Sequence, residues 1–223
     1  MLEVREIYKK YGKKQILKGV TFRAEPGECI GIVGGNGCGK TTLLSILAGV
    51  NRPDRGSICF DGTEAVGKRA LFERYAAYVP QENPLIPELS AKDNYRLWFR
   101  GEKQRMEEDL KNGVGKRLGL AEFLSVPAGK LSGGQKKRLS IASALANRGN
   151  VLILDAPGAA LDLAAKEEIL CYIREYTAQG GTVLLTSHEM TELSACTRLF
   201  LLKGGVLVPT AAGSSAEELI SLF

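Results

Sequence analysis

The stretch CIGIVGGNGCGKTTLLSILAG, residues 29–49, contains the pattern that decides the fold. Residues 29–33 are apolar and predict a buried strand, and residues 41–48 predict a helix that ends at Gly49. Residues 34–41 join them and satisfy G-x-x-x-x-G-K-[ST], the pattern of a phosphate-binding loop. Its glycines let backbone N–H groups converge on phosphate oxygens, while Lys40 reaches β/γ oxygens and Thr41 ligates magnesium. The sequence therefore predicts a phosphate site between a strand and a helix.

The rest of the chain alternates between strand-like and helix-like segments. Expected strands cover residues 2–8, 15–24, 57–60, 151–155, 182–187 and the region near 199–208, and expected helices cover 90–100, 135–147 and 163–178. This alternation predicts an α/β core with a parallel sheet. Residues 85–130 look all-helical, with a capping box at Ser90–Asp93 and interruptions at Gly113 and Gly115. Residues 216–222 predict a short amphipathic helix packed on the core.

The composition excludes several classes of protein. The 223 residues are 44% hydrophobic and 25% charged, which excludes a disordered chain and allows one large domain or two small ones. No apolar run approaches the roughly 18 residues of a membrane span, and no secretory signal is visible, so we expect a cytoplasmic protein. A net charge of +5 falls short of a basic DNA-binding stripe, and five cysteines without a CxxC pair indicate neither a disulfide framework nor a zinc site.

A second glycine-rich motif narrows the assignment. Leu131–Gln135, LSGGQ, opens a predicted helix and would present further N–H and O–H donors to phosphate. Together the two motifs resemble the nucleotide-binding domain of ABC ATPases, and the resemblance extends over essentially the whole chain. It implies an α/β P-loop NTPase core with an N-terminal antiparallel β subdomain and an inserted α-helical subdomain. Within a single domain, the core and β subdomain would take residues 1–85 and 140–223, and the helical signature subdomain residues 86–139.

The resemblance also implies a role for individual residues. Asp155, at the end of the apolar strand VLILD, would join the magnesium shell, and Gln81 would contact magnesium and couple the site to a membrane partner. His188, the only histidine, would hydrogen-bond the γ-phosphate, Tyr11 would stack on adenine, and Asp162 would communicate across a dimer interface.

These roles define the expected site, whose cofactors are ATP and Mg²⁺. The expected nucleotide-binding residues are Tyr11, Gly34, Asn36, Gly37, Cys38, Gly39, Lys40, Thr41, Thr42, Ser132, Gly134 and Gln135. The expected metal ligands are Thr41, Gln81 and Asp155, and the expected catalytic residues are His188, Gln81, Asp155 and Lys40.

The sequence departs from the family pattern directly after Asp155. The family usually places a glutamate there as general base, then proline and a small hydroxyl residue, whereas this chain has Ala156-Pro157-Gly158. Alanine accepts no proton, so the step that the glutamate assists would slow by about 10²–10⁴-fold, which raises its barrier by roughly 3–5 kcal/mol. Three explanations stay open: a naturally degenerate site that pairs with a competent partner, an engineered change that traps ATP, or a site that uses another group such as His188.

The resemblance implies two alternative functions. The first is an ATP-binding subunit, peripheral on the inner face of the cell membrane, which binds Mg-ATP in a head-to-tail homodimer or heterodimer and drives separate membrane permease subunits. The sequence from Gln81 to Arg100 favours export, and hydrolysis would be reduced or partner-dependent. The alternative is a soluble ABC protein that clamps nucleic acid or ribosomes, but such proteins usually carry long coiled coils or two ATPase domains. We therefore expect a transport ATPase with no nucleic-acid partner.

Overall fold

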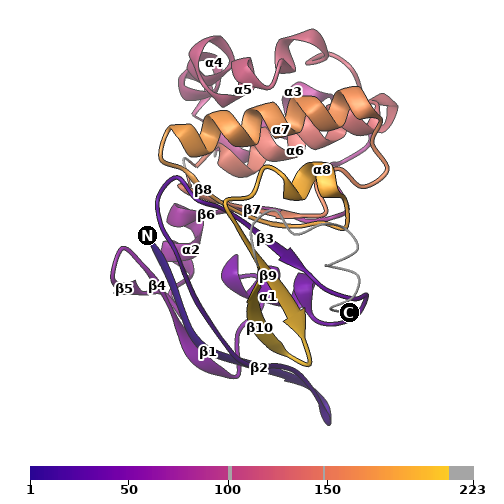
Figure 1. Ribbon diagram of the computed structural model, residues 1–223. Coiled ribbons are helices and arrows are strands. Elements are labelled where there is room, and N and C mark those ends of the chain that lie inside the picture. The colour runs from indigo at the N-terminus through magenta and orange to yellow at the C-terminus, as the bar shows by residue number, and fades with distance from the viewer. Residues whose placement is uncertain (100–101, 148, 211–223) are drawn as a thin grey trace.

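The computed structural model describes residues 1–99, 102–147 and 149–210 (Figure 1). The helix expected over residues 216–222 lies outside the described residues. Within the described ranges, no helix is long and apolar enough to cross a bilayer. The described chain forms two sheets, with helices between them and on the outer face of the larger one (Figure 1).

The smaller sheet is antiparallel and forms at the N-terminal end of the chain. Its order is β2 (Lys14–Ala24), β1 (Leu2–Tyr11), β4 (Arg55–Phe60) and β5 (Thr63–Glu64). Apolar side chains from its strands, such as Val4, Val20 and Ile58, are fully buried, because one face of such a sheet packs on the core. The antiparallel β subdomain expected from the sequence is therefore present.

The larger sheet carries the phosphate-binding loop. Its order is β10 (Val206–Thr210), β9 (Arg198–Lys203), β3 (Cys29–Val33), β8 (Thr182–Thr186), β7 (Val151–Asp155) and β6 (Ala76–Val79). All neighbouring pairs are parallel except β9 and β10. Every residue of β3, β7 and β8 is buried, as expected for parallel strands covered on both faces.

Two layers of helices cover the larger sheet. Helix α1 (Lys40–Leu47) lies between the two sheets, whereas α6 (Gly133–Leu145) and α7 (Leu163–Ala178) lie on the opposite face (Figure 1). Successive side chains of β7 point to opposite faces of the sheet. Val151 and Ile153 join the core around α1, and Leu152 and Leu154 join the core around α6 and α7. The carboxyl ends of the parallel strands meet at one edge, where α/β proteins bind ligands.

The described part of the segment between β6 and β7 is helical, as predicted, but its helices are short. It contains α3 (Ala91–Arg96), α4 (Lys103–Asn112) and α5 (Val114–Arg117), with 3₁₀ turns at Leu97–Phe99, Leu120–Glu122 and Ala128–Lys130. Ser90 caps α3 as the sequence predicts, because its side chain accepts the Asp93 N–H. Asp109 accepts the Val114 and Gly115 N–H groups, and this contact separates α4 from α5 at Gly113.

Some elements were not predicted from the sequence. Helix α2 (Arg69–Tyr75) and strand β6 were missed, and β5 is a two-residue strand. Helix α8 (Met190–Leu193), which follows β8, was also missed. All four are shorter than eight residues, so they carry too little periodicity to stand out, and β6 is recognisable as a strand only through its pairing with β7.

Candidate nucleotide-binding site

The phosphate-binding loop joins β3 to α1 in a conformation that demands glycine. Gly39 precedes α1 with a φ of 113°, and no side chain caps the helix. A Cβ at Gly34 would lie 2.7 Å from the Leu202 carbonyl oxygen and 2.8 Å from Cys38 Sγ. The loop therefore packs tightly on its inner side, and the first N–H groups of α1 are left available to an anion.

Lys40 occupies the interior of this loop. Its Nζ atom donates to the carbonyl oxygens of Gly34 at 2.6 Å and Gly35 at 3.1 Å. These neutral acceptors hold the ammonium group at the mouth of α1, where phosphate oxygens would be stronger, charged acceptors. The position agrees with the role expected of Lys40.

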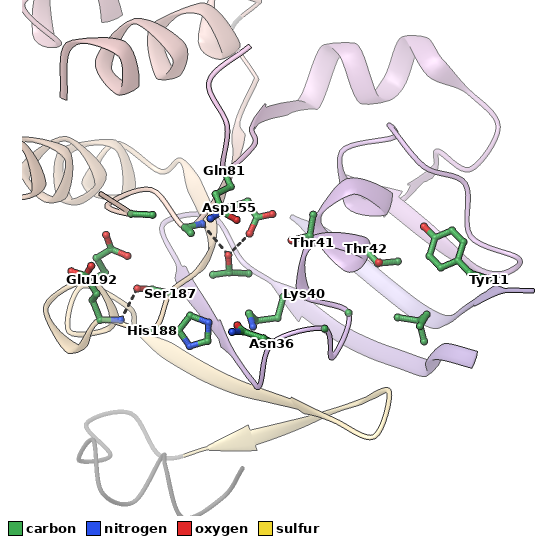
Figure 2. Close-up of a pocket in the computed structure, with 17 residues that line it drawn as sticks. Tyr11, Asn36, Lys40, Thr41, Thr42, Gln81, Asp155, Ser187, His188 and Glu192 are labelled. Atoms are coloured by element: carbon green, nitrogen blue, oxygen red, sulfur yellow. Dashed lines mark hydrogen bonds between the residues drawn. The ribbon is translucent and has the colours of Figure 1, made fainter. Parts of the chain in front are cut away.

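A cavity of about 460 Å³ opens over the loop (Figure 2). Its wall comes from the carboxyl ends of four consecutive strands, β3, β8, β7 and β6, together with Tyr11 and Ile16 at the antiparallel sheet. Tyr11 is 51% exposed and lies at the opposite end of the labelled set from Glu192 (Figure 2). The lining residues expected from the sequence are Tyr11, Asn36, Gly37, Gly39, Lys40, Thr41, Thr42, Gln81, Asp155 and His188.

Asp155 is a buried carboxylate of the cavity, 4% exposed. Its Oδ1 accepts the Thr186 hydroxyl at 2.6 Å, while its Oδ2 has no hydrogen-bond partner among the described residues. A buried carboxylate oxygen without a partner is costly, and burial together with this carboxylate raises the pKa of Tyr78 to about 12.

The residues around Asp155 fit a magnesium ion. Thr41 and Gln81 line the same cavity, and oxygen ligands of this kind, completed by phosphate oxygens and water, suit Mg²⁺. Asp155 Oδ2, which has no hydrogen-bond partner in the described part of the chain, would supply an anionic ligand. An ion held there would neutralise negative charge on bound phosphate groups.

His188 follows β8 and lines the cavity. Partial burial and the charge of Lys40 lower its pKa, so the imidazole is neutral at pH 7 and can donate one N–H. Beside it, the Ser187 hydroxyl accepts the Glu189 N–H at 2.9 Å (Figure 2).

The LSGGQ residues are not part of this cavity in a single chain. Ser132 caps α6 in a reciprocal capping box: its hydroxyl accepts the Gln135 N–H, and Gln135 Oε1 accepts the Ser132 N–H. Ser132, Gly134 and Gln135 do not line the cavity, and neither do Gly34 and Cys38. Of the fifteen expected site residues, ten therefore line one cavity, and the three residues of the signature motif lie apart from Lys40.

Several polar residues at the site were not predicted. Lys137 of α6 is 2% exposed, and its Nζ donates to the Pro80 and Gln81 carbonyl oxygens at 3.3 and 3.2 Å. Burial lowers the pKa of Lys137 to about 8. Thr186, Glu189 and Glu192 line the cavity, whereas Lys137 contacts the Gln81 segment without lining it. For Thr186, Glu189 and Glu192, the only signal in the sequence was a polar residue at or soon after the end of a strand. The burial of such residues depends on contacts between distant segments, which the sequence pattern does not show.

Comparisons with known proteins agree with this geometry. Residues 17–159 match the family model described as ABC transporter. The chain is 34% identical over 207 residues to the cytochrome c biogenesis ATP-binding export protein CcmA of Salmonella typhi, covering 92% of this chain and 98% of that protein. It is 34% identical over 220 residues to the Nod factor export ATP-binding protein I of Burkholderia thailandensis, covering 97% of this chain and 72% of that protein.

Solved structures show the same fold. A dimeric ATP-binding cassette in a post-hydrolysis state, bound to ADP and Pi, matches with a TM-score of 0.83 and 26% identity, covering 96% of this chain and all of that one. An ATP-binding subunit of an ABC transporter matches with a TM-score of 0.85 and 26% identity, covering 100% of this chain and 98% of that one. The chain therefore belongs to the ABC transporter ATP-binding proteins, and its α/β fold is that of the ABC ATPase cassettes.

Proposed function

We propose that this chain is the ATP-binding subunit of an exporter, which binds Mg-ATP at a head-to-tail dimer interface and couples closure and hydrolysis to a separate membrane permease. The observation that carries the proposal is the convergence of Lys40, Asp155 and His188 on one cavity, where Asp155 Oδ2 has no hydrogen-bond partner among the residues that the structure describes. The similar proteins named as ATP-binding export proteins support the export assignment. We propose one domain over residues 1–223, with residues 86–139 as its helical subdomain.

The separation of the LSGGQ motif from Lys40 supports a dimer. Gly134 packs against α7, because a Cβ there would lie 2.6 Å from Ala165 Cβ. Ser132 is exposed, and Leu163, next to Asp162 at the start of α7, is 82% exposed. In a head-to-tail pair, Ser132, Gly134 and Gln135 would complete the site of the partner, and Leu163 would be covered. The dimeric state of a similar ATP-binding cassette supports this arrangement.

The helical segment supports a permease surface. Lys137 joins α6 to the Pro80 and Gln81 carbonyls, so a shift of the Gln81 loop would be transmitted to the helix that carries LSGGQ. Near this segment, Ile86 and Leu97 are 44% and 57% exposed. We propose that these apolar side chains face the permease at the inner face of the membrane.

Ala156 is expected to make hydrolysis slow. Its N–H donates to the Thr186 carbonyl oxygen at 3.1 Å and to Thr186 Oγ1 at 3.0 Å, with φ at 46°. The backbone at this position is therefore fixed, and only the side chain of the usual glutamate is missing. Binding of Mg-ATP would be retained while turnover is reduced.

The test is phosphate release from Mg-ATP at several protein concentrations. We expect release above the background of Lys40→Ala, a rate per chain that rises with protein concentration, and at least a tenfold faster rate in Ala156→Glu. If neither the natural chain nor Ala156→Glu releases phosphate above the Lys40→Ala background, the proposed ATPase is contradicted. If the two proteins release it at equal rates, the impairment by Ala156 is contradicted.

A further inference from the structure

Three carboxylates line the cavity among the described residues: Asp155, Glu189 and Glu192. Asp155 accepts the Thr186 hydroxyl and is the expected magnesium ligand. Both oxygens of Glu189 contact Lys166 Nζ, at 2.9 and 2.7 Å. Glu192 is 3% exposed and forms no ion pair within the described ranges. Of the three, Glu192 is therefore the carboxylate that neither pairs with a cation nor is an expected metal ligand.

The loop that lacks the usual glutamate is shaped around Glu192. A Cβ added to Gly158 would lie 1.8 Å from Glu192 Oε1. The φ of Gly158 is outside the left-handed region, so its backbone is open to any residue. A side chain there is opposed mainly by the Glu192 carboxylate, with Lys166 Cγ at 3.3 Å as a further close neighbour. The Gly158 N–H and the Ser187 hydroxyl interact with this carboxylate. The absence of a side chain at Gly158 thus leaves space that a carboxylate from α8 enters.

We propose that Glu192 accepts the proton of the attacking water in place of the glutamate that position 156 lacks. The inference rests on the proposed function, because it assigns a group to ATP hydrolysis. The water oxygen forms a bond to the γ-phosphorus, and the bond from that phosphorus to the bridging oxygen breaks, with its electron pair leaving on ADP. The water proton passes to the Glu192 carboxylate and from there to solvent.

The surroundings of Glu192 suit a general base. Burial raises the pKa of this carboxyl above its ordinary value of 4.5, and the charge of Glu189 raises it further, while Ser187, the Gly158 N–H and Lys166 oppose the rise. A general base is most effective when its pKa approaches the working pH. Ser187 directly precedes His188, so the strand end that positions the γ-phosphate contact also positions this carboxylate.

The experiment is a double-variant cycle of Glu192→Gln and Ala156→Glu, measured by phosphate release and by Mg-ATP affinity. The Gln amide oxygen can still accept the Gly158 N–H, so the substitution removes the basic group with little change in shape. We expect Glu192→Gln to lower kcat at least tenfold in the natural chain with Mg-ATP affinity unchanged. In the Ala156→Glu background, where position 156 supplies the base, the same substitution should lower kcat less than threefold.

The cycle separates a catalytic role from a structural one. An equal loss in both backgrounds, or no loss in either, would overturn the inference while leaving the proposed ATPase intact. Absence of release by the natural chain above the Lys40→Ala background would overturn the inference, and absence of release by Ala156→Glu as well would also overturn the proposed ATPase. If Glu192→Gln does not fold, Gly158→Ala in the same two backgrounds replaces it, because the added Cβ displaces the carboxylate without removing it. A natural-chain rate unchanged by Gly158→Ala would also overturn the inference.

Discussion

Replacement of Thr186 by valine tests how Asp155 is held before magnesium binds. Thr186 is 1% exposed, and its hydroxyl donates to Asp155 Oδ1 at 2.6 Å. Valine has nearly the same shape, so no cavity forms and the loss is confined to hydrogen bonds. A bond to a charged acceptor contributes about 1.5–3 kcal/mol. The Ala156 N–H keeps the Thr186 carbonyl as an acceptor at 3.1 Å, so we expect a total loss of about 2 kcal/mol.

Thr182→Val is the matched control for this substitution. Thr182 lies on the same strand, is 3% exposed, and its hydroxyl donates to the neutral Glu25 carbonyl oxygen at 3.0 Å. A hydrogen bond between neutral groups contributes only about 1 kcal/mol. The difference in stability loss between the two variants therefore measures the effect of the Asp155 charge, separately from the loss of a buried threonine hydroxyl.

The assay is urea unfolding without nucleotide, supported by thermal unfolding. A loss of about 2 kcal/mol lowers the Tm of a chain of this size by about 4–8 °C. We expect Thr186→Val to lose about twice the free energy that Thr182→Val loses. If Thr186→Val is no more destabilised than Thr182→Val, the Asp155 carboxylate does not depend on this hydroxyl and the reasoning is refuted.

Three further changes test other parts of the site. Tyr11→Ala should weaken Mg-ATP binding about 5- to 150-fold by calorimetric titration, because a base–aromatic stack contributes about 1–3 kcal/mol, and Tyr11→Phe should retain the affinity. Gly34→Ala should destabilise the chain by about 1–3 kcal/mol in thermal unfolding, since its Cβ meets Leu202 O at 2.7 Å, whereas Gly35→Ala, with nothing within 4 Å, should not. The pKa of Glu192 is raised in the folded state, so its stabilising contribution is present below pH 4.5 and is lost as the pH rises through the folded-state pKa. In urea titrations, the unfolding free energy of the natural chain minus that of Glu192→Gln should therefore fall between pH 4 and 7. A rise in this difference would contradict the assignment.

The parts of the site that could be predicted are those that the chain places at strand ends. Lys40, Asp155 and His188 each follow a recognisable apolar strand. The phosphate-binding loop pattern itself predicted a phosphate site at Lys40, whereas the roles of Asp155 and His188 were implied by the resemblance to ABC ATPases. All three line one cavity because the carboxyl ends of parallel strands meet at one edge. The phosphate-binding loop pattern likewise predicted β3 and α1 correctly.

The missed residues depend on contacts that no local pattern contains. Glu192 lies on a four-residue helix and becomes buried only because Gly158, from a distant loop, leaves space for its carboxylate. Lys137 follows LSGGQ in a helix whose polar residues would normally face solvent, and it is buried by the Pro80 and Gln81 carbonyls. Burial of a charged side chain is a tertiary property, so hydrophobic periodicity does not indicate it.

Calorimetric titration of the natural chain and of Lys40→Ala with ATP in the presence of Mg²⁺ tests the central claim most directly. The claim is that the cavity over the phosphate-binding loop holds Mg-ATP. We predict saturable binding of one ATP per natural chain and an affinity at least tenfold weaker in Lys40→Ala, which is about 1.4 kcal/mol. No binding to the natural chain, or equal affinity in the two proteins, would contradict the account.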